Sequence, residues 1–167
     1  MPLIAMVIAC FASLFLYSAA VYWLLHDALG MQHVFAGLYR MFMYHAAHPY
    51  QYIALFCAVY ALVLALVLQL FPQMASKRRW AVLACTLLFT LLLASVMGGV
   101  LWKVHDMQAG YFTEGARLWR DLLWGAENGV QVGWQVLALS QPFGLLCLPG
   151  FVVVTAQCCK RAHKAHR

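Results

Sequence analysis

Two pairs of adjacent histidine and aspartate residues, which we call the His-Asp steps, have types and spacing that could support proton transfer or metal binding. The pattern Trp-x-x-His-Asp occurs at Trp23–Asp27 and again, 79 residues later, at Trp102–Asp106. An imidazole titrates near neutral pH, so it can pass a proton, and it can also ligate haem iron or a divalent metal. A neighbouring carboxylate can orient such a ring. We expect His26 and His105 to approach one another across a pseudo-two-fold axis and to form one polar site.

The same residues also fit a structural role. Arg40 and Arg120 recur downstream of the two copies and are natural partners for Asp27 and Asp106. Such carboxylate–guanidinium pairs would fix each outer segment onto its membrane helix, and the histidines would then only cap or bond backbone groups. The predicted paired site comprises His26, Asp27, His105, Asp106, Arg40 and Arg120, flanked by Trp23 and Trp102.

A second candidate site contains soft metal ligands. Met41, Met43, His45 and His48 lie close together in the sequence. Two imidazoles three residues apart on a helix can share one ion, and thioethers beside imidazole suit Cu(I). The competing interpretation is that methionine and histidine are merely tolerated at a membrane interface. The sequence is compatible with haem b or copper as a cofactor and does not distinguish between them.

Motifs for enzymatic catalysis are missing from the sequence. It contains no Ser-His-Asp spacing, no glycine-rich phosphate loop and no HExxH motif. Its acidic residues number five and all lie outside the apolar runs. The sequence therefore favours a non-enzymatic protein.

The elements that position these residues are membrane helices. The chain is 65% hydrophobic and 10% charged, with a mean hydropathy of +0.79, whereas soluble domains carry about 25% charged residues. An apolar run of about 20 residues can cross the hydrocarbon core as a helix. Four uncharged runs qualify: Leu3–Leu25, Tyr50–Phe71, Trp80–Trp102 and about Trp134–Cys158. The predicted fold class is an all-α integral membrane protein.

A tandem duplication organises these four helices. Besides the Trp-x-x-His-Asp pattern, Leu38–Ala46 aligns with Leu118–Ala126 at an offset of 80 residues. We therefore expect two tandem helical hairpins, residues 1–79 and 80–167, which run the same way through the membrane.

Two segments outside the apolar runs are amphipathic. Glu114–Ala126 follows a plausible N-cap at Thr113 and has Arg117 and Asp121 spaced as a helical ion pair. We expect it to form a short interfacial helix, and the duplication predicts the same for Val34–Met43.

Small and helix-breaking residues predict helix contacts. Pro142 and Pro149 each lack a backbone donor, so the fourth helix should be interrupted. Ser95, Gly98 and Gly99 on the third run permit close approach of a neighbouring helix.

Orientation follows from the positive charges. Seven cations lie between the second and third runs or after the fourth, and every acid lies on the other side. The positive-inside rule therefore predicts cytoplasmic termini and outward-facing His-Asp steps, in what we interpret as a bacterial inner membrane. The net charge of +6 is explained by these segments and by attraction to anionic lipid rather than to nucleic acid.

The sequence thus favours a non-enzymatic subunit of a membrane transport or respiratory complex, or a small carrier. Its expected partners are the lipid bilayer and other membrane subunits or further copies of itself. The alternative is a haem- or copper-binding membrane redox protein that uses the outer-face histidines.

Overall fold

The computed structural model describes residues 3–31, 49–71, 78–111, 117–139 and 141–165. Within these ranges the regular structure is helical and no strand occurs, so the predicted all-α class is confirmed. The long helices are α1 (Leu3–Trp23), α3 (Pro49–Leu70), α5 (Arg79–Gln108), α6 (Leu118–Leu139) and α7 (Leu148–Ala165). A π-helical turn, η1 (Leu24–Ala28), extends α1, and a 3₁₀ turn, η3 (Phe143–Cys147), precedes α7.

Four helical stretches are long and apolar enough to cross a membrane. They are Ile4–Ala28, Pro49–Leu70, Trp80–Gln108 and Phe143–Arg161. The first three contain nearly all of the predicted runs. The fourth begins after the predicted start at Trp134, because α6 continues to Leu139 and takes in the first part of that run.

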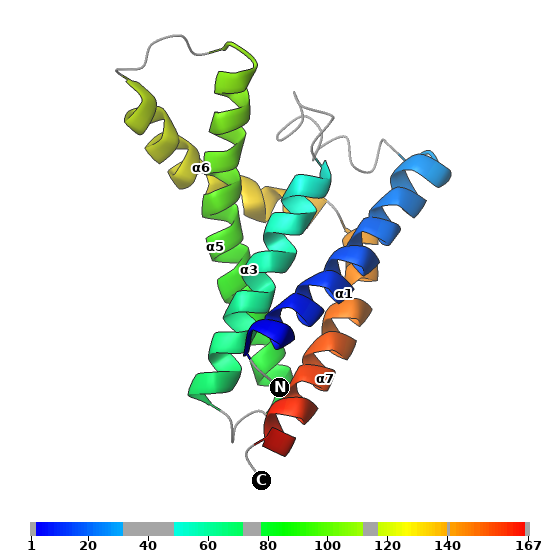
Figure 1. The fold of residues 1–167 in the computed structure, drawn as a ribbon. Helices are drawn as coiled ribbons and strands as arrows, with labels where there is room; N and C mark the ends of the chain where they lie inside the picture. The colour runs from blue at the N-terminus through cyan, green and yellow to red at the C-terminus, as the bar shows by residue number, and fades with distance from the viewer. Residues whose placement is uncertain (1–2, 32–48, 72–77, 112–116, 140, 166–167) are drawn as a thin grey trace.

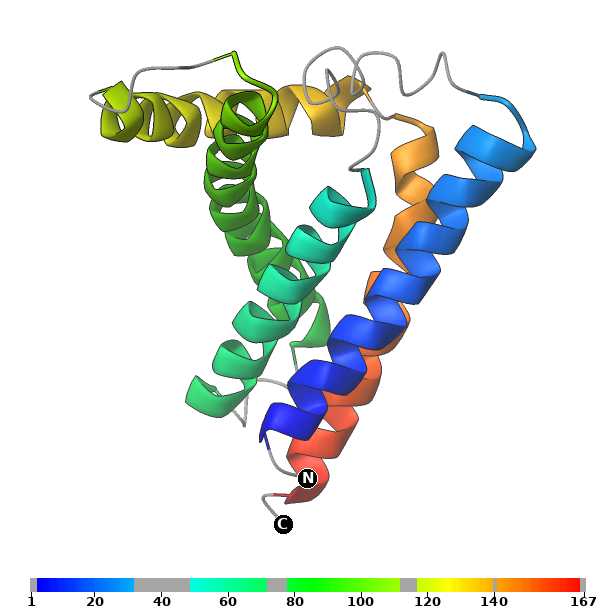
Figure 2. The ribbon, with the colours of Figure 1, turned by 45° about the horizontal axis from the view of Figure 1, so that its top comes forward.

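The four candidate membrane helices run alternately up and down (Figure 1). The first residues of α1 and the last residues of α7 lie at the same end of the bundle. At the opposite end α1 and α5 finish, α3 begins, and α6 lies across the other helices (Figure 2). We call this opposite end the α6 end.

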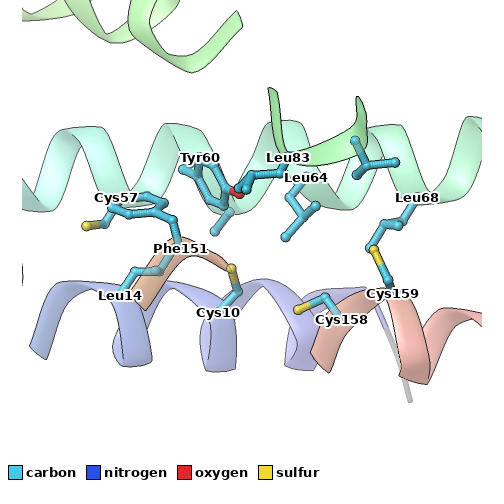
Figure 3. Close-up of a cluster of buried hydrophobic side chains, with 12 residues drawn as sticks. Cys10, Leu14, Cys57, Tyr60, Leu64, Leu68, Leu83, Phe151, Cys158 and Cys159 are labelled. Atoms are coloured by element: carbon cyan, nitrogen blue, oxygen red, sulfur yellow. The ribbon is translucent and has the colours of Figure 1, made fainter. Parts of the chain in front are cut away.

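The core lies where α1, α3 and α7 meet. Tyr60 of α3 is fully buried, its ring packs edge-on against Phe151 of α7 at 4.7 Å, and its hydroxyl bonds to Thr155. Leu83 reaches into the same cluster from α5, and cysteines fill the remaining space as small apolar residues (Figure 3). Burial between α1, α3 and α7 thus holds the first and last helices together.

Helices α5 and α6 approach each other through glycine. A Cβ atom placed on Gly99 would lie 1.9 Å from the carbonyl oxygen of Gly125, and one on Gly129 would lie 2.2 Å from that of Ser95. Gly133 likewise faces Ser95, where an added Cβ would lie 1.9 Å from the hydroxyl. Only glycine permits backbones this close. The predicted close approach at Ser95 and Gly99 is therefore a contact with α6.

The amphipathic segment predicted at Glu114–Ala126 is part of a longer helix. Helix α6 begins at Leu118 and ends at Leu139, and residues 112–116 lie outside the described ranges, as does the segment Val34–Met43. The chain then turns at Gln141 and Pro142. Proline has no amide hydrogen to continue the helix, which explains why the interruption lies here.

The two halves are not divided into helices in the same way. The alignment pairs α3 with residues 129–150, but those residues are divided between α6, the turn, η3 and the start of α7. The tandem duplication and its two hairpins, residues 1–79 and 80–167, stay a prediction from the sequence.

Candidate polar site at the α6 end of the bundle

The first His-Asp step lies on the π-helical turn that extends α1. His26 is buried, and its Nδ1 donates a hydrogen bond of 2.7 Å to Oδ1 of Asp27. The imidazole stacks on the ring of Tyr22 with a centroid distance of 5.0 Å. From α3, the hydroxyl of Tyr50 donates to Oδ2 of Asp27 at 3.5 Å. This π-helical turn at the end of α1 contains both His26 and Asp27.

The second His-Asp step lies in the last turns of α5. Nε2 of His105 is 3.1 Å from Oε1 of Gln51, and Nδ1 is 3.4 Å from the hydroxyl of Tyr52. A side-chain amide oxygen only accepts hydrogen bonds, so Nε2 donates to Gln51, whereas the Tyr52 hydroxyl can donate to Nδ1 or accept from it. His105 is therefore held in place by two residues of α3.

Helix α3 connects the two copies through its first turn. Tyr50 contacts the copy on α1, whereas Gln51 and Tyr52 contact the copy on α5. Successive helical residues point about 100° apart, so three consecutive side chains can reach helices on different sides of α3. Both copies thus share a neighbour. The expected convergence of the two imidazoles on one cavity stays a prediction.

Lys103 is the principal residue that the sequence interpretation missed. Its ammonium group bonds to Oδ2 of Asp106 at 3.0 Å and lies 4.6 Å from the ring centroids of both Trp102 and Trp124. Lys103 is 7% exposed, as is Asp106. The cation is thus enclosed by one carboxylate and two indoles. The glycine contacts of α5 and α6 bring Trp124 to this position.

The tryptophans of the two copies have different surroundings. Trp102 packs against Trp124 with ring centroids 5.9 Å apart, whereas Trp23 is 55% exposed. The residue after Trp23 is Leu24, which is also exposed, so the first copy has no counterpart of Lys103. The repeated pattern therefore builds two unlike sites.

Among the predicted arginine partners, only Arg120 lies in the described part of the chain. It is exposed on α6, and the described cation bonded to Asp106 is Lys103. Arg40 lies outside the described residues, as do the predicted metal ligands Met41, Met43, His45 and His48.

Metal ligation by His105 would require a change in its hydrogen bonds. His105 uses both ring nitrogens on protein groups, so it would have to release Gln51 or Tyr52 in order to ligate a metal. Within the described ranges, no three His, Cys, Asp or Glu side chains are grouped so that they could hold a metal ion.

Two sequence signals could have revealed more of this site. Lys103 is the single cation that directly adjoins an apolar run at the predicted outer end, between Trp102 and the second His-Asp step. Gly125, Gly129 and Gly133 repeat every four residues, which is the spacing of a close helix contact.

Known proteins give no further guide to this site. A scan against protein-family models found no match, and searches of curated proteins and of solved structures found no similar protein.

Proposed function

We propose that this protein is a non-enzymatic subunit of a membrane transport or respiratory complex, or a small carrier, and that it works through the polar site at the α6 end. The observation that carries the proposal is the burial of both histidines, at 7% and 5% exposure, beside one turn of α3 that bonds to Asp27 and to His105. Ionisable side chains at the ends of membrane helices are costly to bury, and in membrane proteins they often mark sites of function.

The placement of the chain in the membrane is part of this proposal. Large apolar side chains are exposed on the candidate membrane helices, among them Leu62, Leu66, Leu88 and Phe89. These fit contact with lipid or with another membrane subunit. Helix α6 exposes Trp119, Leu123 and Trp134, which suits a helix lying at the headgroup level.

The orientation and compartment of the protein are also proposals. Lys160 and Arg161 at the end of α7 are exposed, as is Arg78 before α5, at the end of the bundle far from α6. The positive-inside rule places this end in the cytoplasm of a bacterium and the polar site on the outer face of the inner membrane.

The double variant His26→Gln/His105→Gln tests the role of the site. Glutamine keeps hydrogen-bonding capacity but removes titration near neutral pH. We expect this variant to insert normally and to lose the larger assembly that the tagged wild-type chain forms in mild-detergent membrane extracts on native gels. If the protein is instead a carrier, neither the wild type nor the variant should form a larger assembly, and the variant should lose proton-dependent ion flux in proteoliposomes.

A matched control is His163→Gln/His166→Gln, which removes two imidazoles from the basic tail. It should behave as the wild type in both measurements. If the His26/His105 variant also behaves as the wild type in both, the paired histidines are structural and the proposed site is wrong.

Absorbance and elemental analysis address the haem or copper alternative. We expect the purified protein to show no Soret band and no stoichiometric copper, because both nitrogens of His105 are engaged by α3. A reduced-minus-oxidised spectrum with sharp haem bands, or one copper per chain, would replace the proposed function with a redox function.

A further inference from the structure

Lys103 fills a site whose geometry is that of an ammonium receptor. Aromatic faces within about 6 Å of a cation attract it, and the indole of tryptophan does so most strongly. The Lys103 ammonium lies 4.6 Å from both the Trp102 and Trp124 centroids, and Asp106 accepts its hydrogen bond at 3.0 Å. We call Trp102, Trp124 and Asp106 the cage.

Packing alone does not require a lysine at this position. A buried ion pair loses much of its attraction to desolvation, and apolar residues of similar volume often replace it without loss of stability. The corresponding residue of the first copy is Leu24, which needs no cage. The second copy therefore contains a group of cation-binding residues, the cage, in addition to the pattern that both copies share.

The cage lies close to the surface of the molecule. Trp124 is 47% exposed, so one wall of the cage is in contact with the surroundings. Lys103 lies near the end of α5, at the α6 end of the bundle (Figure 2). A lysine ammonium is carried on a flexible four-carbon stem, so side-chain rotation alone can change its position.

We propose that the cage binds a primary ammonium group and that Lys103 is a tethered occupant which an external ammonium ligand displaces. The ligand is either a free amine or the headgroup of an ethanolamine phospholipid, since both present the same group. The proposal names a ligand class for part of the polar site and in that respect rests on the proposed function.

The experiment compares Lys103→Met with the wild type. Methionine keeps an unbranched stem but removes the competing cation. Binding is measured by tryptophan fluorescence and thermal stability, with ethanolamine as the free probe and with nanodiscs of phosphatidylethanolamine or phosphatidylcholine as the lipid probes. Lys160→Met, on the exposed end of α7, is the matched control because it removes one positive charge outside the cage.

We expect both the wild type and Lys103→Met to bind a primary ammonium, the variant at least about tenfold more tightly because the intramolecular competitor is gone. Lys160→Met should bind like the wild type. Lys103→Met/Asp106→Asn and Lys103→Met/Trp124→Leu should lose binding. Lys103→Met leaves Asp106 buried without its cation, so its folding is checked first by thermal unfolding, whereas Lys103→Met/Asp106→Asn removes both charges together.

The two sources give different results. Stabilisation by phosphatidylethanolamine discs but not by phosphatidylcholine discs identifies a lipid headgroup, whether or not ethanolamine also binds. Saturable binding of ethanolamine in detergent, without a difference between the two kinds of disc, identifies a free amine. Absence of both overturns the proposal, as does binding that survives the Asp106 and Trp124 substitutions. The proposal is also overturned if Lys103→Met binds the probe and the wild type does not, because an external ammonium then does not displace Lys103.

Failure here is distinguishable from failure of the proposed function. Lys103→Met leaves both histidines in place, and the His26/His105 double variant leaves the cage in place.

Discussion

Asp27 and Asp106 occupy the same place in the repeated pattern but differ in their surroundings. The side chain of Asp27 is 44% exposed and bonds to a histidine, whereas that of Asp106 is 10% exposed and bonds to a lysine. The identity of the partner and the degree of burial decide how much each carboxylate contributes to stability. The shared pattern therefore does not imply equal energies.

Asp106→Asn should destabilise the protein by about 3–5 kcal/mol, because it leaves the Lys103 ammonium buried without its counter-charge. Asp27→Asn is the matched control and should cost about 1 kcal/mol or less, since its carboxylate is partly solvated. The free energy of unfolding in mixed detergent micelles measures both. Equal losses for the two variants would show that the Lys103–Asp106 pair contributes nothing beyond an exposed pair.

At the scale of elements, the contact between α5 and α6 determines the shape of the site. This contact brings Trp124 beside Lys103 and holds α6 across the end of the bundle. It depends on glycines, because a side chain at these positions would overlap the facing backbone. A change that separates the two helices should therefore disturb the cage before it disturbs the core.

The substitutions Gly99→Ala and Gly98→Ala affect adjacent residues but should differ in their effect on stability. The added Cβ of Gly99→Ala would lie 1.9 Å from the carbonyl oxygen of Gly125, so we expect a loss of about 3 kcal/mol or more. The Cβ of Gly98→Ala would lie 3.9 Å from the ring of Tyr52, an ordinary contact. Because alanine is a better helix former than glycine, Gly98→Ala should be neutral or stabilising by up to about 1 kcal/mol.

Thermal unfolding in detergent, with circular dichroism as the readout, distinguishes the two alanine variants. Tryptophan fluorescence should change only for Gly99→Ala, since that substitution displaces Trp124. A Gly99→Ala variant that is as stable as Gly98→Ala would mean that α6 does not pack on the Gly99 face.

At the scale of the whole molecule, the chain ends and the polar site lie at opposite ends of the bundle (Figure 1). Exposed Arg78 precedes α5 and exposed Lys160 and Arg161 end α7, whereas both His-Asp steps lie at the α6 end. The proposed orientation rests on the cations at the end far from α6.

Single cysteines in a cysteine-free background test the proposed orientation. A membrane-impermeant maleimide added to intact cells should modify Tyr111→Cys, after α5, and spare Arg78→Cys, before α5. Both residues are exposed, so access to the reagent depends on the side of the membrane. Permeabilised cells are the control, in which both should react. Labelling of Arg78→Cys alone in intact cells would invert the proposed topology.

The sequence by itself determined the features that depend on composition and local pattern. Long uncharged runs must form helices where water is absent, so the all-α class and three of the four candidate spans could be predicted. The repeated pattern also identified His26 and His105, because identical spacing recurs despite the bias towards apolar residues.

Only the tertiary structure decided which residues surround these groups. The distances from Gln51 and Tyr52 to His105, and from Trp124 to Lys103, depend on how helices distant in sequence pack against each other. Likewise, the sequence of the fourth apolar run does not show which of its residues belong to the preceding helix and which belong to the membrane span after the proline. The structure answers that question: residues 134–139 belong to α6, and the fourth candidate span begins at Phe143.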